Sequence, residues 1–275
     1  MTSAATARPF ERKIVARNNA VQSANVIHAD EGARAMGFQA ALVPGTALYS
    51  YLESAIRGSL GPGWAERGAA EVRFTAPAHD GDQLTAAAAP SGDGTAVEAV
   101  VTRDETGQVA ATARAWLLGP GEEPPDVAGF PPAELPASPP PFSEAWALDI
   151  GELGSLSLAP TRADIGEFLS GIGEPPDLFG DDVPSAFLSR NYARLMSENV
   201  VRSSPSIHTS SRIRRFRRVE LGEPLSVRGH IDRLFGRRGN RYYVLDMAYV
   251  GEGGDVVMAQ RHTGIYRPRQ RTPVA

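Results

Sequence analysis

The stretch that decides the fold runs from Ser23 to Ile56 and reads SANVIHADEGARAMGFQAALVPGTALYSYLESAI. It begins as a polar turn with one histidine, His28, and continues as a short helical segment ending near Met36. A sharp turn at Val43-Pro44-Gly45 follows, and apolar residues then recur at the spacing of a helix buried on one side. Glycines and a proline at positions 58–63 predict where this helix ends.

The segments around this helix have the pattern of strands. Apolar and β-branched residues between turn-forming clusters predict strands at 10–17, 70–76, 83–89, 96–102 and 109–118. The last two form a predicted hairpin around Asp104–Gly107. One apolar helix among several antiparallel strands is an α+β unit, and a helix this apolar predicts a sheet curled around it.

Composition limits the class of protein. The chain has 275 residues, 42% hydrophobic and 22% charged, as in soluble globular proteins of one large or two ordinary domains. The net charge of −4 gives no general attraction to nucleic acid. The absence of cysteine excludes disulfides and thiolate chemistry. With no secretory apolar segment and no long apolar run, we expect a cytoplasmic protein without a membrane span.

The first half of the chain is followed by an altered copy. Val183-Pro184-Ser185 opens an apolar segment as Val43-Pro44-Gly45 does, 140 positions earlier. Gly222 follows Gly81 by 141 positions, and a last hairpin near Gly251–Asp255 matches the one at Asp104–Gln108. Three matches in register indicate an internal duplication, with one longer hairpin near 236–240 in the second copy.

A proline-rich segment separates the copies. Residues 119–142 contain nine prolines, which lack the N–H that helices and central strands need. We therefore predict an N-terminal unit at 1–118 that carries the site, an extended surface linker at 119–145, and a non-catalytic unit at 146–275.

This arrangement resembles the hotdog fold and, within it, the MaoC-like (R)-specific enoyl-CoA hydratases. That family has an Asp-x-Asn-Pro-x-His-x-Asp turn, a helix opened by glycine, and a strand motif ending in Gly-Asp. The matching residues here are Ser23–Asp30, Gly45 and Gly81-Asp82. The resemblance covers most of the chain outside the linker and termini, and it implies two fused hotdog units, each an antiparallel sheet around one central helix.

The resemblance also implies a reaction and the residues that perform it. In the family, the turn's aspartate and histidine handle a water molecule at the double bond next to a thioester carbonyl, which a backbone N–H near the helix-opening glycine polarises. His28 would be the base or acid here, with Asn25 and Asp30 as supports and the Gly45 N–H as the oxyanion donor. The sequence departs from the family at Ser23, which replaces the aspartate, and at Val26, which replaces the proline.

The second copy lacks these groups. Its turn reads Gly171–Asp177, with Ile172 in place of the aspartate and Asp177 in place of the histidine, so we expect no active site there. We expect this half to widen the groove for the acyl chain.

Three other basic residues are candidates for contact with the substrate's carrier group. His208, at the start of a strand, could approach the groove. Arg214 and Arg215 belong to a dense arginine run whose ordinary interpretation is a solvated edge strand. Its alternative is a patch for coenzyme A phosphates or an acidic carrier protein. Nucleic acid is disfavoured, and no histidine pair has metal-ligand spacing, so we expect no metal.

We therefore expect a hydro-lyase that interconverts a trans-2-enoyl thioester and an (R)-3-hydroxyacyl thioester. It needs no cofactor, because coenzyme A or phosphopantetheine is part of the substrate; an acyl carrier protein and a homodimer are options. One alternative is a non-catalytic acyl-thioester binder. Another is a hotdog thioesterase, for which Glu53 is the available helix carboxylate.

Overall fold

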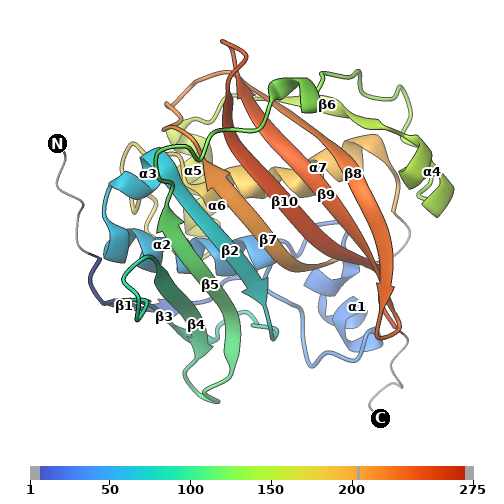
Figure 1. Cartoon of the computed structure of the whole chain (residues 1–275). Helices are drawn as coiled ribbons and strands as arrows, with labels where there is room; N and C mark the ends of the chain where they lie inside the picture. Colours follow the sequence, from blue (N-terminus) through green and yellow to red (C-terminus); the bar gives the residue numbers. More distant parts are fainter. Residues whose placement is uncertain (1–6, 203–204, 270–275) are drawn as a thin grey trace.

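The computed structural model describes residues 7–202 and 205–269. They form a ten-stranded antiparallel sheet with helices on its inner face (Figure 1). The strands are β1 (Phe10–Val15), β2 (Gly68–Phe74), β3 (Gln83–Pro90), β4 (Val97–Arg103), β5 (Val109–Leu117), β6 (Glu152–Leu158), β7 (Ile207–Arg215), β8 (Leu225–Arg237), β9 (Asn240–Gly251) and β10 (Val256–Arg267).

The helices are mostly short. They are α1 (Asp30–Ala35), α2 (Gly45–Leu60), α3 (Gly63–Arg67), α4 (Glu144–Asp149), α5 (Arg162–Gly171), α6 (Ser185–Ser189) and α7 (Asn191–Asn199), with 3₁₀ turns η1 (Val26–His28) and η2 (Val127–Gly129). Within the described ranges, no helix is long and apolar enough to cross a membrane.

The strand order repeats in the two halves of the sheet. The order across the sheet is β1-β3-β4-β5-β2-β7-β10-β9-β8-β6. Strands β1 to β5 therefore occupy the same relative places as β6 to β10, and the halves meet where β2 pairs with β7. Glu71 lies opposite Arg212, its equivalent 141 positions later, while Val72 and Ala70 lie opposite Ser211 and Ile213. A register symmetric about Glu71 agrees with the predicted duplication.

Two equivalent glycines mark the same turn in each half. Gly81 and Gly222 have φ of 83° and 78°, which side chains rarely adopt. Gly81 N–H donates to the Ala16 carbonyl, and Gly222 N–H donates to the Pro160 carbonyl. The backbone requirement for glycine explains why this position stands out in both copies.

Helix α2 is the buried centre of the first half. It packs against β1, β3, β4 and β5, and Tyr51, Leu52 and Ile56 are fully buried. Helix α2 ends at Leu60 with Gly61 as its C-cap, inside the interval 58–63 that the sequence predicted. Gly58 is needed for close packing: a Cβ there would lie 2.4 Å from the ring of Phe10.

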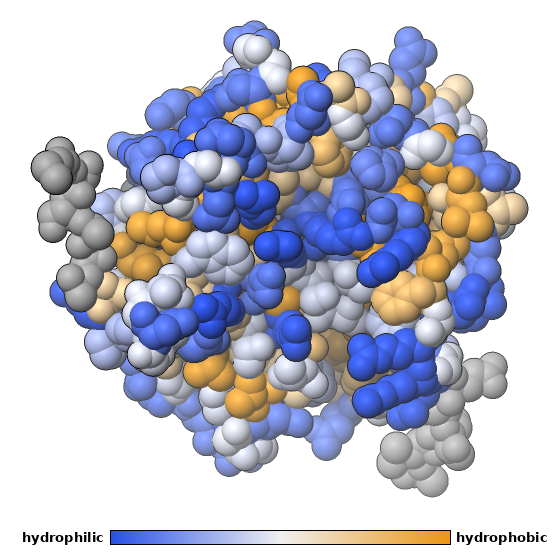
Figure 2. All heavy atoms as spheres, in the orientation of Figure 1, coloured by the Kyte–Doolittle hydropathy of each residue, from blue (hydrophilic) through white to orange (hydrophobic). Residues whose placement is uncertain are grey.

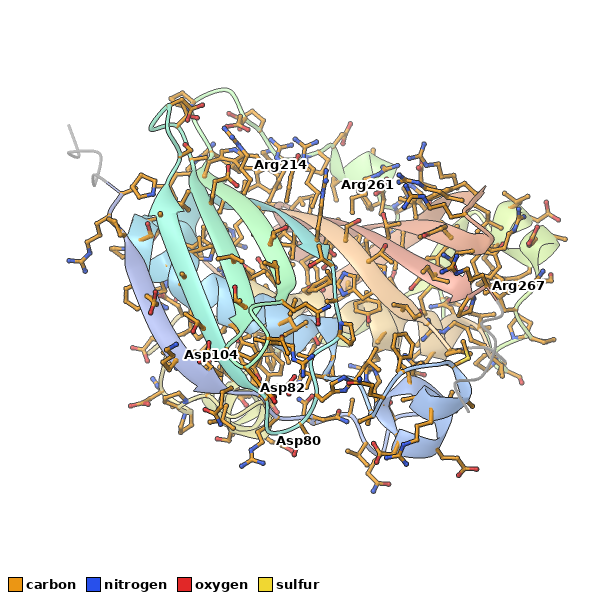
Figure 3. The ribbon with its side chains drawn as sticks, turned by 90° about the horizontal axis from the view of Figure 1, so that it is seen from below. Asp80, Asp82, Asp104, Arg214, Arg261 and Arg267 are labelled. Carbon is orange, nitrogen blue, oxygen red and sulfur yellow. The ribbon has the colours of Figure 1, made fainter. Side chains whose placement is uncertain are left out.

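The arginine-rich strand is central, which corrects the prediction of an edge strand. Strand β7 lies between β2 and β10. Its alternation turns Ile213 and Arg215 inward, while Arg212 and Arg214 face outward and pair with Glu71 and Glu122. Figure 3 shows Arg214 and Arg261 on the outer face, and Figure 2 shows hydrophilic side chains gathered over the middle of that face.

The segment between the two sets of strands lies along the outer face. Arg67 donates to the carbonyls of Gly119 and Glu122, and Arg228 donates to that of Phe130. The Phe130 ring is buried in a small apolar cluster with Leu118 and Phe216 among others. The segment is thus held down, and the predicted boundaries at 118 and 145 stay a prediction because one sheet runs through both halves.

Candidate active site

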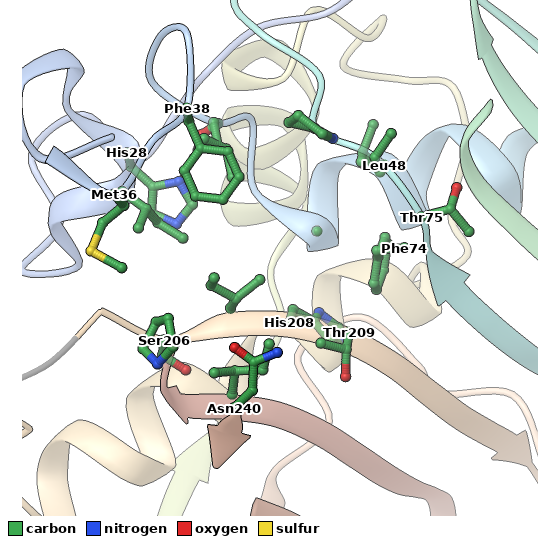
Figure 4. Close-up of a pocket in the computed structure, with 18 of the residues that line it drawn as sticks. His28, Met36, Phe38, Leu48, Phe74, Thr75, Ser206, His208, Thr209 and Asn240 are labelled. Atoms are coloured by element: carbon green, nitrogen blue, oxygen red, sulfur yellow. Dashed lines mark hydrogen bonds between the residues drawn. The ribbon is translucent and has the colours of Figure 1, made fainter. Parts of the chain in front are cut away.

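His28 stands at the side of a cavity of about 450 Å³ between the α1 region and strand β7 (Figure 4). Its Nδ1 lies 2.7 Å from the Leu42 carbonyl oxygen, which can only accept, so Nδ1 carries the proton and Nε2 is left as a base. Asn18 Nδ2 donates to the His28 carbonyl at 2.9 Å and fixes the backbone. Burial lowers the pKa of His28, against a smaller opposite effect of the Leu42 bond, so the imidazole is neutral at pH 7.

The amino end of α2 faces the same cavity. Gly45 lines it, and the first turn is capped by no side chain. Within the described ranges, the N–H groups of Gly45 and Thr46 have no hydrogen-bond acceptor. Free N–H groups at the start of a sixteen-residue helix favour negative charge.

His208 lies directly against Gly45. A Cβ on Gly45 would be 3.0 Å from His208 Nδ1, so only glycine fits here without displacing the ring. His208 Nε2 is 2.8 Å from Ser211 Oγ, and the buried Nδ1 has no partner. Burial lowers the pKa of His208 to about 3. Ser211 Oγ also accepts from Gln260 Nε2 at 3.5 Å and can donate its own proton to His208 Nε2; in that tautomer the His208 proton is on Nδ1, beside Gly45.

Asn25 joins the turn to the second half of the molecule. Its Nδ2 donates to the Ser206 carbonyl at 2.7 Å, and its Oδ1 accepts from Ser206 N–H at 3.2 Å. These bonds use one donor and one acceptor of the amide, and Asn25 also lines a smaller cavity beside His28, so its expected role in orienting the water or the imidazole stays a prediction. Asn25 holds the His28 turn against the start of β7.

Asp30 and Ser23 are placed differently from the family pattern. The Asp30 carboxylate is exposed, accepts from Ala41 N–H at 2.8 Å, and pairs with Arg34 at 2.9 Å. The Ala41 bond, with Arg34, lowers its pKa. Asp30 lines neither cavity beside His28, so the expectation that it supports the imidazole is not met. Ser23 lines a second, smaller cavity that also touches His28.

The expected carrier contacts at Arg214 and Arg215 are corrected by the fold. Arg214 lies on the outer face, 3.8 Å from Glu122. Arg215 is 1% exposed, and its Nη1 donates to the Val183 carbonyl at 2.6 Å. The cavity instead opens beside Arg238, Asn240 and Arg269, where Arg269 N–H donates to Asn240 Oδ1. In the sequence, the only indication of these lining residues was the longer hairpin near 236–240.

The second half has its corresponding helix end filled. Glu53 is 1% exposed, and its carboxylate accepts from Ser185 N–H and Ala186 N–H, both at 2.8 Å, and from Trp64 Nε1 at 2.9 Å. Ser185 is the equivalent of Gly45, so an internal carboxylate occupies the amides that stay open in the first half. Glu53 lines neither cavity, which removes the predicted helix carboxylate of a thioesterase. In the described ranges, no group of three or more His, Asp or Glu could hold a metal ion.

Comparison with known proteins identifies the fold. No family model and no curated protein matches the sequence. A protein assigned as a MaoC domain dehydratase from Chloroflexus aurantiacus has a TM-score of 0.59 at 14% identity, with 96% of each chain covered. A dehydratase from the difficidin assembly line gives 0.53 at 14% identity, covering 96% of this chain and 95% of that one. A protein assigned as an oleoyl thioesterase from Lactobacillus plantarum gives 0.53 at 12%, covering 98% and 100%.

These likenesses show that the chain has the hotdog fold, so the expected fold class is confirmed. The resemblance to the MaoC-like proteins is confirmed at the level of that fold. Dehydratases and a thioesterase share it, so the choice of reaction depends on the residues of the site.

Proposed function

We propose that the protein is a hydro-lyase that interconverts a trans-2-enoyl thioester and an (R)-3-hydroxyacyl thioester. One observation carries this proposal: His28, whose Nε2 is free, and Gly45, whose N–H is the first open amide of α2, line the same cavity. A base and a site for negative charge, placed on either side of one substrate-sized space, are what enolate chemistry requires.

The first step in the hydration direction is attack by water. His28 Nε2 takes a proton from the water, and the water oxygen bonds to C3. The π pair of the C2=C3 bond then forms the C1=C2 bond of the enolate, and the π pair of the carbonyl moves onto the thioester oxygen. The Gly45 N–H and the His208 Nδ1–H stabilise that oxygen. His208 thereby keeps a substrate-binding role, now at the carbonyl.

The second step returns the proton. The imidazolium of His28 donates it to C2 while the enolate collapses to the thioester, so the base is restored. No aspartate or glutamate lines either cavity beside His28 within the described residues. A cycle with one base is therefore the one these residues support, and Ser23 needs only to hold a water molecule.

The cavity mouth suits the carrier end of such a substrate. The guanidinium groups of Arg238 and Arg269 make no hydrogen bond or ion pair within the described residues. They could bind a phosphate of coenzyme A or of a carrier pantetheine. The apolar residues inside, among them Met36, Leu48 and Ile265, suit an acyl thioester.

The test uses the purified protein with crotonyl-CoA and longer enoyl-CoAs, followed through the absorbance of the conjugated thioester. We expect hydration by the wild type and loss of it in His28→Gln. Release of free thiol without hydration would indicate a thioesterase. Binding without turnover at any chain length would indicate the non-catalytic binder.

A further inference from the structure

A second cavity of about 200 Å³ lies beside His28. His28, Tyr192 and Ser206 line both cavities, so the two meet at the proposed reacting centre. The mouth residues Arg238 and Arg269 line only the first cavity. If the substrate enters at these residues and reacts at His28, the part of its acyl group beyond C3 lies in the second cavity.

This second cavity is lined by two guanidinium groups and no carboxylate. Arg190 lies at the junction of α6 and α7, with its guanidinium carbon 4.2 Å from the ring centre of Phe187 and 5.3 Å from that of Phe168. Its guanidinium makes no hydrogen bond and no ion pair within 4 Å inside the described ranges. Burial lowers its pKa, but arginine keeps its charge. Arg190 is therefore a partly desolvated cation whose donors are unused.

The nearby acids do not neutralise Arg190 by contact. Asp164 acts on it only at longer range, because the Asp164 carboxylate accepts from Thr161 N–H and Thr161 Oγ1 in the capping box of α5. Glu167 likewise acts only through longer-range charge.

Arg202 approaches the same space from the end of α7. Its Nη1 is buried and has no acceptor among the described residues. Two guanidinium groups with free N–H donors fit a carboxylate, which accepts paired bonds from such forks. Asn19, Ser23 and Thr46 add further polar groups to the lining.

We propose that the acyl group of the substrate ends in a carboxylate, bound by Arg190 and Arg202 in this second cavity. The substrate class would be the thioester of a short unsaturated dicarboxylic acid. A liquid water molecule occupies about 30 Å³, so a cavity of about 200 Å³ has room for about seven heavy atoms, enough for a short acyl end with a carboxylate and not for a long alkyl chain. This inference rests on the proposed function for the direction of the substrate.

The test measures binding and needs no turnover. Glutaryl-CoA and valeryl-CoA have acyl groups of equal carbon number, carry no double bond to hydrate, and differ in the terminal carboxylate. We expect the wild type to bind glutaryl-CoA at least about tenfold more tightly in calorimetry. Arg190→Met, which keeps apolar cover over the two phenylalanines, should remove that preference and leave valeryl-CoA binding unchanged. Arg202→Met should reduce it.

Arg194→Met is the matched control. Arg194 is on α7, exposed, and 3.9 Å from Glu198, so its loss should leave the preference intact. Equal binding of both thioesters by the wild type, an undiminished preference in Arg190→Met, or binding of neither thioester would overturn the proposal. A glutaryl preference without hydration of any enoyl-CoA would leave this inference standing and remove the hydro-lyase. Hydration of crotonyl-CoA without a preference for glutaryl-CoA would support the hydro-lyase and overturn the carboxylate-binding inference.

Discussion

At the scale of single residues, the hydrogen-bond partners of His28 and His208 suit these two histidines to different roles. The Leu42 carbonyl fixes the proton of His28 on Nδ1, whereas the Ser211 hydroxyl can donate to His208 Nε2 and so allows the proton of His208 to lie on the nitrogen facing Gly45. His28 therefore presents a lone pair to the cavity, and His208 can present a donor. His28 could be chosen from the pattern of its turn, but the role of His208 depends on a serine three positions away and on the helix end opposite.

Replacing His28 with glutamine should stop the reaction with little effect on binding. General-base catalysis contributes roughly 10²–10⁴ in rate, so we expect kcat to fall by at least about a hundredfold while KM changes little. Steady-state hydration kinetics measure both. A thermal unfolding curve like that of the wild type is the control, and retained kcat would remove His28 from the mechanism.

The pH profile should report the lowered pKa of His28. Burial disfavours the imidazolium, so the neutral base persists to lower pH than in a free histidine. We expect log kcat/KM to be flat at neutral pH and to fall only below about pH 6.5, the unperturbed value. His208 should add no inflection there, because its pKa of about 3 leaves it neutral. An inflection above pH 6.5 would contradict the assignment.

Loss of the donor on His208 should affect the chemical step. Removing one oxyanion donor costs about 10²–10³ in kcat in known cases, so His208→Leu should lower kcat by about that amount at similar KM. His208→Gln keeps an N–H donor and should recover part of the rate. Nitrogen chemical shifts of the His208 ring would show the tautomer directly, and protonation on Nε2 would contradict this role.

At the scale of elements, the two halves differ in what meets the amino end of the central helix. Cavity space, His28 and His208 surround the start of α2, whereas the Glu53 carboxylate closes the start of α6. Arg215 is buried nearby and is held by the Val183 carbonyl. The sequence pattern showed that both helices open with Val-Pro, but Glu53 and Ser185 lie 132 positions apart, so their contact could not be read from it.

Glu53 should therefore contribute to stability and not to turnover. Removing one member of a buried charge arrangement costs about 3–5 kcal/mol, so Glu53→Gln should lower the free energy of unfolding by an amount of that order. Urea titration measures it, with Glu66→Gln on α3 as the control. The double variant Glu53→Gln with Arg215→Met should recover part of the loss. Unchanged stability would show that the carboxylate does not hold α6.

At the scale of the whole molecule, local sequence patterns predicted the helices and strands, whereas the tertiary fold determined which residues meet at the site. The duplication was visible in the sequence because the local backbone conformation requires the same residue types in both copies. These residues are Gly81 and Gly222, which have positive φ, and the two Val-Pro turns. The arginine run looked like an edge strand because nothing local shows that Glu71 and Glu122 face it. Arg190, Arg202 and Arg238 join the cavities only after the halves meet, so no spacing in the chain could identify them.

The continuity of the sheet predicts that the halves do not fold separately. Several bonds cross between them: Tyr51 Oη donates to the Ile172 carbonyl, Arg57 pairs with Asp182, and Asn25 clamps Ser206. Residues 1–143 alone would expose the β2 edge and leave the Glu53 carboxylate without its α6 amides. We expect this fragment to be unfolded or self-associated, as measured by NMR dispersion and sedimentation. A well-folded monomer would contradict this, because it would mean that β2 and α2 are stable without β7 and α6.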